Sequence, residues 1–306
     1  MRIGTVIESY EILEKLGTGE VYRARHTVTG HYTAIKRLVP AGAGDLDRFM
    51  QEAVAAARID DAGIVRVLDR LAAPDGSTLV VMELLEGKTL AARLEQEGRV
   101  PLETAALLGR QIARAVAAAH RAGIVHGDLT PSNIFLVDDD DLQGGVRAKV
   151  LDFGLARLVK RAGPAYLAPE QWRGPRDEDK RADIYSLGCI FYEMICGRPP
   201  FLGDRDELRS KHESALVLPP GMLVTSLVPA ADAVVARALA KRPGDRFTDM
   251  DEFAVALGTM VGAADLATQP ERRRRSFTLT AALGALLAII AAAICCAVVA
   301  RAPAGH

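Results

Sequence analysis

Cysteine and net charge are both scarce in this chain of 306 residues. It contains only four cysteines, which are too few for a scaffold held together by disulfides at this length. Two of them lie in apolar runs, where we expect them to behave as small buried hydrophobic residues. The 38 Lys and Arg residues are balanced by 39 Asp and Glu residues, so that the formal net charge is −1. Because phosphate neutralisation needs clustered cations, this balance argues against nucleic acid as a partner.

The first ten residues, MRIGTVIESY, lack the apolar segment of a secretory signal peptide. We therefore expect that nothing there carries the following residues across a membrane. The hydrophobic fraction of 49% and the charged fraction of 25% are those of a globular protein. The length is sufficient for one large domain or two moderate ones with a substantial core.

A long uncharged run lies near the other end of the chain. Residues 277–300 contain no charge and no proline, and as a helix they would cross a hydrocarbon core of about 30 Å. The preceding basic linker, 261–276, includes Arg272 to Arg275. Because cations favour the cytoplasmic flank, we predict a single-pass protein of the inner (plasma) membrane, with its large N-terminal part in the cytoplasm and 301–306 as a short extracytoplasmic tail. The alternative is a buried core helix that follows a basic patch for nucleic acid.

The coarse pattern predicts two lobes. Residues 10–83 contain short, partly alternating segments separated by glycine turns, which indicate antiparallel strands with one helix at 45–59 and a turn at Asp75-Gly76. Residues 86–260 are mainly helical. We therefore predict an α+β fold in which a small strand-rich lobe and a larger helical lobe flank a cleft.

Within the helical lobe, four segments carry helical patterns. One helix should run between Pro101 and Gly123, because proline suits the first turn of a helix and glycine suits its end. The other three patterns lie at 183–196, 229–241 and 249–257. The run DDDD at 138–141 does not match a calcium-binding loop and indicates a solvated turn.

One short loop carries the strongest chemical signal. The segment HGDLTPSN, residues 126–133, places Asp128 and Asn133 five positions apart between the helical patterns. Taken alone, the two side chains could simply cap turns, as Asp and Asn often do in loops. Five other signals accompany the loop in a fixed order: Lys36 in TAIK on the third predicted strand, Glu52 on the following helix, LDFG at 151–154, APE at 168–170 and DIYSLG at 183–188.

In this order the signals resemble the protein kinase signature set, and closely the bacterial membrane-anchored (Hanks-type, eukaryotic-like) serine/threonine kinases. The resemblance covers about residues 10–260 and implies a bilobal kinase fold that uses ATP and Mg²⁺. It implies that Lys36 holds the α- and β-phosphates of ATP and is held in turn by Glu52. It also implies that Asn133 and Asp152 ligate Mg²⁺ and that Asp128 accepts the proton of the substrate hydroxyl.

The resemblance also assigns the nucleotide pocket. The backbone from Met82 through Glu83 to Leu85 would bond the adenine, whose apolar walls would be Val21, Ala34 and Phe135. Gly17 and Gly19 belong to the glycine-rich loop, which is expected to be several residues shorter than usual at GTGEV and so to reach the phosphates less well. The resemblance further implies packing roles for His126 and Phe153, and an ion pair between Glu170 and Arg246.

Three positions depart from the common kinase pattern. Gly127 replaces the Arg that often receives an activating phosphate, and the segment 152–170 has no Ser or Thr. Thr130 replaces a Lys that steadies the γ-phosphate, and Gly163 replaces a Thr that bridges this Lys to the catalytic Asp. We expect a loop held without phosphorylation and a slow reaction, because a cation beside the developing charge is missing.

Three functions remain open at this point. The first is a protein kinase that phosphorylates Ser or Thr of cytosolic protein substrates. The second is a membrane-tethered pseudokinase that acts as a scaffold. The third is a small-molecule phosphotransferase, because HGDL also looks like the loop of the aminoglycoside and choline kinases. The sequence leaves the substrate, the upstream signal and the formation of a homodimer undecided.

Overall fold

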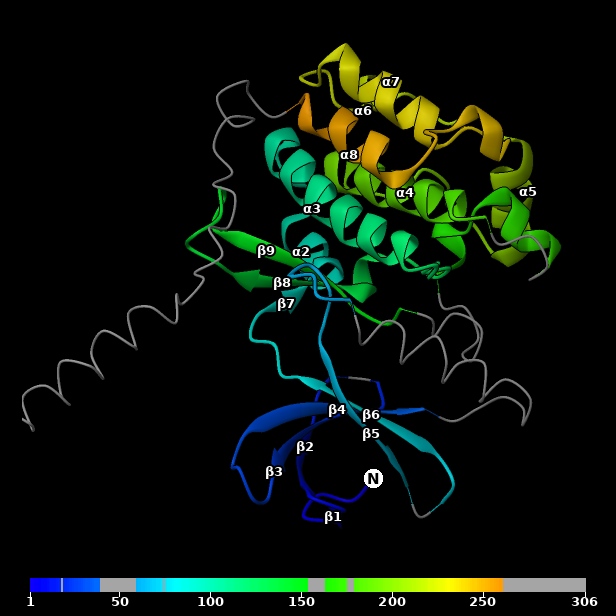
Figure 1. The fold of residues 1–306 in the computed structure, drawn as a ribbon. Coiled ribbons are helices and arrows are strands. Elements are labelled where there is room, and N and C mark those ends of the chain that lie inside the picture. The colour runs from blue at the N-terminus through cyan, green and yellow to red at the C-terminus, as the bar shows by residue number, and fades with distance from the viewer. Residues whose placement is uncertain (18, 39–58, 74, 154–162, 175–178, 261–306) are drawn as a thin grey trace, which may run out of the picture. The chain divides into compact units, whose positions relative to one another are not determined.

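The strand-rich front of the chain forms one antiparallel sheet in the computed structural model (Figure 1). The structure describes residues 1–17, 19–38, 59–73, 75–153, 163–174 and 179–260, and all of them belong to one compact unit, Met1–Gly262. The spatial order of the strands is β1-β2-β3-β4-β6-β5. Their bounds are β1 Val6–Ile7, β2 Tyr10–Lys15, β3 Val21–His26, β4 Tyr32–Leu38, β5 Val67–Ala72 and β6 Thr78–Glu83.

Alternation of buried and exposed side chains explains the sheet. Ile12, Ala24, Ile35, Leu79 and Val81 are fully buried in its own hydrophobic cluster. The predicted antiparallel arrangement is confirmed, with one difference in detail. The Lys36 strand is the fourth rather than the third, because the short β1 precedes it. In the sheet, β4 pairs with β6.

The predicted turn between the last two strands is confirmed. Gly76 has a φ of 81°, a backbone conformation that suits glycine. The carboxylate of Asp75 accepts hydrogen bonds from the backbone N–H (3.0 Å) and the hydroxyl (2.6 Å) of Ser77. The helix predicted at 45–59, and Glu52 with it, lies outside the described residues apart from Ile59.

The helical lobe is organised around α4 (Arg181–Cys196), most of whose residues are fully buried. The long α3 (Leu102–Arg121) packs against α4 and α8 (Met250–Gly258). Pro101 caps α3 and Gly123 follows it with a φ of 77°. The four predicted helical patterns are thus confirmed. The remaining helices are α2 Leu90–Glu97, α5 Arg205–Ser214, α6 Pro220–Leu223 and α7 Pro229–Ala238.

A second, three-stranded sheet in the helical lobe was not foreseen. It consists of β7 (Lys88–Thr89), β8 (Ile134–Asp138) and β9 (Val146–Val150) in that order. β7 has only two residues, too few to show a period. The DDDD run begins at Asp138, the last residue of β8, and its other three residues begin the turn to β9, so the expected turn is present from 139 onward. β9 is also tied to the segment before β5, because Val150 donates to Gly63 O at 2.7 Å and Val65 donates to Val150 O at 3.1 Å.

Short 3-10 helices lie at Pro131–Asn133, Pro164–Tyr166, Pro169–Arg173 and Pro243–Asp245. The predicted membrane-spanning helix at 277–300 and the linker at 261–276 fall outside the described residues. Among the helices that are described, none has the run of apolar residues that a bilayer crossing requires. The α+β fold with two lobes is confirmed.

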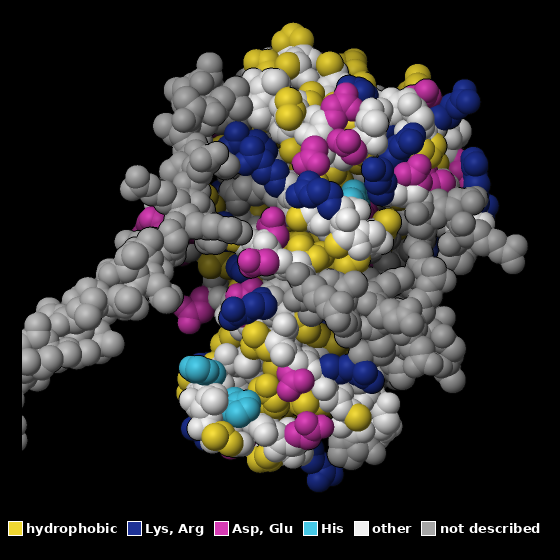
Figure 2. Space-filling view, in the orientation of Figure 1, with side chains coloured by type: hydrophobic (Ala, Val, Ile, Leu, Met, Phe, Trp, Pro, Cys, Tyr) yellow, Lys and Arg dark blue, Asp and Glu magenta, His cyan; other side chains and the backbone are white. Residues whose placement is uncertain are grey.

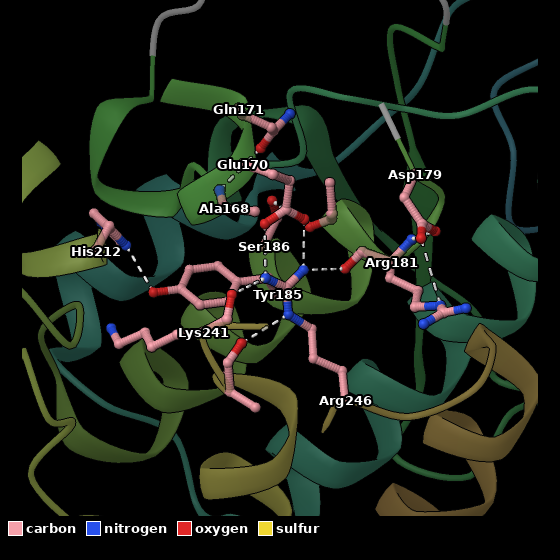
Figure 3. Close-up of polar contacts among 12 residues, drawn as sticks. Ala168, Glu170, Gln171, Asp179, Arg181, Tyr185, Ser186, His212, Lys241 and Arg246 are labelled. Atoms are coloured by element: carbon pink, nitrogen blue, oxygen red, sulfur yellow. Dashed lines mark hydrogen bonds and ion pairs between the residues drawn. The ribbon is translucent and has the colours of Figure 1, made fainter. Parts of the chain in front are cut away.

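A buried polar cluster braces the base of the helical lobe (Figure 3). The guanidinium of Arg246 donates to both carboxylate oxygens of Glu170, at 2.7 and 2.8 Å, and also to the backbone oxygen of Arg181 at 2.9 Å. The ion pair implied by the resemblance is therefore present. Beside it, His212 Nδ1 lies 2.9 Å from the hydroxyl of Tyr185, and both residues are fully buried.

The buried imidazole of His212 makes folding sensitive to acid. Burial lowers the pKa of His212 to about 4, and the neighbouring Lys241 cation acts in the same direction. Because the unfolded chain keeps the ordinary value of about 6.5, it binds a proton between pH 6.5 and 4 that the folded chain does not bind. We expect the melting temperature to fall as the pH drops through this window, and His212→Gln to remove that component. The control is His31→Gln, at an exposed histidine. If both variants lost the pH dependence of the melting temperature equally, the acid sensitivity could not be assigned to His212.

Candidate active site

The loop that carries Asp128 is fixed by a buried carboxylate on α4. Asp183 accepts hydrogen bonds from the backbone N–H of His126 at 2.9 Å and of Gly127 at 2.8 Å. His120 Nε2 lies 2.7 Å from the same carboxylate. Burial by itself raises the pKa of Asp183, but these hydrogen bonds, together with the nearby imidazoles, hold its pKa below the usual value. An ionised group therefore anchors the start of the loop.

The imidazole of His126 then connects this loop to the LDFG segment. Its Nε2–H donates to the carbonyl oxygen of Leu151 at 2.9 Å, and its Nδ1 accepts the backbone N–H of Asp128 at 3.3 Å. The ring also packs against Phe153 at a centroid distance of 4.9 Å. The packing roles expected for His126 and Phe153 are confirmed.

Asn133 closes the loop on itself. Its side-chain nitrogen donates to the backbone oxygen of Asp128 at 2.9 Å, and its backbone oxygen accepts the N–H of Leu151 at 2.8 Å. The side-chain nitrogen of Asn133 is thus used for the bond to Asp128, while its side-chain oxygen is the atom that a cation would bind. Asp128, Asn133 and the residue that precedes Asp152 are thus held in fixed register.

Lys36 meets Asp152 across the two lobes. The Nζ of Lys36, on β4, lies 2.5 Å from Oδ2 of Asp152, and both side chains are partly buried. Asp152 has a φ of 63°, an unusual backbone conformation for a residue other than glycine. Such strain persists where the surroundings fix the chain, and it is concentrated at functional sites. Here the carboxylate turns toward the lysine of the opposite lobe.

These residues share one cleft of about 690 Å³. Lys36, Asp128, Asn133 and Asp152 all line it, so that four of the five residues predicted to be catalytic converge on one space. Figure 2 shows the sheet lobe below and the helical lobe above. The small lobe adds Glu20, Arg37 and Leu38 to the lining, and the helical lobe adds residues of α2 and α4 as well as Thr130, Gly163 and Tyr166.

The residues predicted to hold adenine do not line this cleft, and all of them except Leu85 lie on strands. Ala34 pairs with Met82 across β4 and β6, and Val21 pairs with Lys36 across β3 and β4. Phe135 lies on β8, opposite Thr89. The register therefore places Val21 and Ala34 next to the strand positions of Lys36 and Met82.

Two other predicted segments, the connection between the two lobes and the glycine-rich loop, are each held by contacts with neighbouring residues. The carboxylate of Glu83 pairs with Lys149 Nζ at 2.7 Å and joins the end of β6 to β9, while Leu85 lies in the following connection. Gly17 and Gly19 lie in the short turn between β2 and β3, which Leu16 closes by donating to Val21 O at 2.8 Å. Gly17 has a φ of 65°, and so the turn uses the conformational freedom of glycine.

Two departures from the kinase pattern fit each other sterically. A Cβ added at Gly163 would lie 2.4 Å from Cγ2 of Thr130 and 3.1 Å from Cδ2 of Tyr166. The methyl group of Thr130 therefore occupies the space that a side chain at position 163 would need. Gly127, the third departure, has a φ of 73°, which glycine adopts without strain.

Sequence reasoning missed a polar pair on the wall of the cleft. The hydroxyl of Tyr166 donates to Oε2 of Glu193 on α4 at 2.6 Å, and both residues line the cleft. Burial raises the pKa of Glu193 even though this hydrogen bond lowers it. Tyr166 lies between the LDFG and APE signals, and Glu193 lies inside a predicted helix, but no local pattern indicates their contact.

A family model for the protein kinase domain matches residues 10–254. The chain belongs to the protein kinase family. It is 35% identical over 282 residues to the "probable serine/threonine-protein kinase PknB" of Corynebacterium glutamicum, covering 83% of this chain and 42% of that protein. It is 36% identical over 273 residues to the serine/threonine-protein kinase PknL of Mycobacterium tuberculosis, covering 84% of this chain and 65% of that protein. The chain thus spans less than two thirds of these relatives.

The donor atoms of this kinase domain suit the cofactors that the family uses. Asp152 and Asn133 offer a carboxylate and an amide oxygen, the hard ligands that Mg²⁺ prefers. Within the described parts of the chain, no group of three or more His, Cys, Asp or Glu side chains forms a metal cage. The two oxygen donors of Asp152 and Asn133 suit a cation that nucleotide phosphates would also bind. Lys36 would add a positive charge for those phosphates.

The contact between Thr130 and Gly163 can be tested by a double-mutant cycle. Gly163→Ala should lower the melting temperature by about 2–8 °C, because the new methyl group meets Thr130 in a packed site. Thr130→Ser removes only the obstructing methyl, so the double variant should recover most of the loss. Gly244→Ala, whose Cβ would meet nothing closer than Arg181 at 4.0 Å, is the control. Strictly additive shifts would show that the two residues are not in steric contact.

Proposed function

We propose that the protein is an ATP- and Mg²⁺-dependent protein kinase that transfers the γ-phosphate to Ser or Thr hydroxyls of cytosolic protein substrates. One observation carries the proposal: Lys36, Asp128, Asn133 and Asp152 line the same cleft between the lobes. The printed names of the two relatives, both serine/threonine-protein kinases, support the choice of acceptor.

In the proposed reaction each side chain has a separate task. Lys36 would bind the α- and β-phosphates of the nucleotide in place of its ion pair with Asp152. Asp152 and Asn133 would hold the cation, which would neutralise charge on the phosphates. Asp128 accepts a hydrogen bond from the substrate hydroxyl, orients its oxygen toward the γ-phosphate and receives its proton. Glu52 would pair with Lys36, as the resemblance implies.

We propose that phosphorylation of Ser or Thr in the segment 152–170 does not control the kinase. The segment contains neither Ser nor Thr, and Gly127 offers no cation for a phosphate. Its described end is held by contacts within the chain: Glu170 pairs with the guanidinium of Arg246 at 2.7 Å, and Ser186 donates to the backbone oxygen of Tyr166 at 2.8 Å.

A membrane-tethered pseudokinase is the second candidate. The short turn between β2 and β3 and the absence of a lysine at position 130 favour it, because both features weaken contacts to the phosphates. Such a protein would keep the kinase fold and use it as a docking platform. It would bind nucleotide weakly and transfer little phosphate.

Phosphate transfer by the full chain separates the two candidates. With radiolabelled ATP, Mg²⁺ and a general protein substrate, Asp128→Asn should lower the rate by about 10²–10⁴-fold, the usual contribution of a catalytic base. Asp140→Asn, on the exposed β8–β9 hairpin, should leave the rate unchanged. A melting temperature raised by Mg²⁺ and ATP, with equally little transfer by wild type and Asp128→Asn, would favour the pseudokinase.

We further propose that residues 277–300 anchor the protein in the plasma membrane as a single helix, with the kinase domain in the cytoplasm. The uncharged length of the run supports the span, and the block from Arg272 to Arg275 supports the orientation. The same features would place 301–306 outside the cytoplasm.

Protease protection checks this topology. Protease added to intact spheroplasts should leave the kinase domain uncut, because the membrane shields it, and lysis should expose it to digestion. Moving the four arginines to follow residue 300 should reduce this protection, since the cation bias sets the orientation. Digestion of the domain in intact spheroplasts would reverse the proposed orientation.

A further inference from the structure

The helical lobe carries an exposed apolar surface that kinase chemistry does not require. It lies in residues 215–231, seventeen positions without one charged residue in a chain that is 25% charged. Leu216, Leu218, Met222, Leu223 and Val228 project from it into solvent, and Leu216 and Met222 are 94% and 70% exposed. We call these five residues the apolar ridge. Apolar side chains gather over α6 and α7 at the top of Figure 2.

The ridge is held rigidly from beneath. Between its exposed members, Pro220 is buried, while Val217 and Leu227 pack against the core of the helical lobe. Asp232, the first charged residue after the run, turns back to accept the backbone N–H of Gly221 at 2.8 Å. The outward direction of the apolar side chains is therefore built into the fold. A contiguous apolar surface of this kind marks an interaction site.

The position of the ridge indicates what it meets. Leu227, within the same run, lines a groove together with Leu102 at the start of α3. Met260, where the described chain ends, packs against Leu107 one to two turns further along that helix. The loop before α7 and the end of α8 are neighbours in Figure 1. The last described residue, Met260, therefore lies near the same end of α3 as Leu227 of the uncharged run.

We propose that the apolar ridge rests on the lipid bilayer, so that the kinase domain lies against the membrane instead of moving freely beneath it. This inference rests on the proposed membrane anchor. Residues 261–276 span at most about 58 Å, even fully extended, and so keep this end of the domain near the bilayer at all times. The arginines at 272–275 attract anionic headgroups, and the ridge offers no acidic side chain that these headgroups would repel.

The chemistry of the ridge fits a membrane interface. Leucine, methionine and valine side chains gain by entering the boundary between headgroups and acyl chains, about 5–10 Å deep. Such weak insertion would suffice, because the tether already removes most of the cost of bringing the surface to the membrane. The active-site cleft is lined by other elements than α6 and α7, so the domain could rest on the bilayer without blocking its own substrate site.

Tryptophan quenching by brominated lipids tests the contact in the full chain. Met222→Trp would place a probe on the ridge, and Val28→Trp, at a position that is 83% exposed on the sheet lobe, would be the matched control. Each variant is reconstituted into phosphatidylcholine–phosphatidylglycerol vesicles with or without brominated acyl chains. The emission of the single native tryptophan, Trp172, is subtracted by means of the wild-type chain.

We expect brominated lipid to remove most of the emission added by Met222→Trp and little of that added by Val28→Trp. If neither is quenched although the chain floats with the vesicles, the ridge does not touch lipid and the inference fails. If the emission at position 222 shifts to the blue without quenching, the ridge is covered by protein, either a second copy or another segment of this chain, and the inference also fails. A chain that does not float would instead overturn the proposed anchor.

Discussion

The candidate active site of this kinase domain depends on one buried carboxylate. Asp183 accepts two backbone N–H groups of the catalytic loop and contacts His120. A carboxylate that is fully buried must be compensated by such donors, because an unpaired charge in the interior is strongly unfavourable. The loop cannot move away from Asp183 without leaving this charge exposed to an apolar interior. The loop held by Asp183 contains His126, whose imidazole hydrogen-bonds the carbonyl oxygen of Leu151. This bond fixes the position of the neighbouring Asp152.

The helix that carries Asp183 explains why distant segments meet in one cleft. Along α4, Asp183 holds the catalytic loop, Ser186 holds Tyr166 through its backbone oxygen, and Glu193 holds the same tyrosine through its hydroxyl. Since α4 is buried on nearly all sides, these three contacts share one rigid support. Asp183, Ser186 and Glu193 thus lie three and seven residues apart along one helix. Together they fix the position of the catalytic loop relative to the loop that contains Tyr166, although the two loops lie some forty residues apart in the sequence.

Sequence patterns correctly predicted those strands, turns and helices whose formation depends on interactions between residues close together in the chain. Strand alternation, the Asp75-Gly76 turn and the helix between Pro101 and Gly123 each depend on a few neighbouring residues, and all are present. Motif order indicated Lys36, Asp128, Asn133 and Asp152, which line one cleft. By contrast, α5 was missed because its sequence is dominated by polar residues, with Leu208 and His212 as its buried contacts. The contact of Tyr166 with Glu193 depends on tertiary packing, which no short pattern records.

The departures from the common kinase pattern form a consistent set when they are considered as packing. Gly127 adopts a left-handed backbone conformation in which its N–H group donates to Asp183. Its carbonyl oxygen accepts a hydrogen bond from the side-chain amide of Gln171. A glycine at 163 leaves space for the methyl of Thr130, which fills it. Both glycines are accommodated by backbone hydrogen bonds and close packing of the described residues. The fold around the catalytic loop is therefore held by the chain itself.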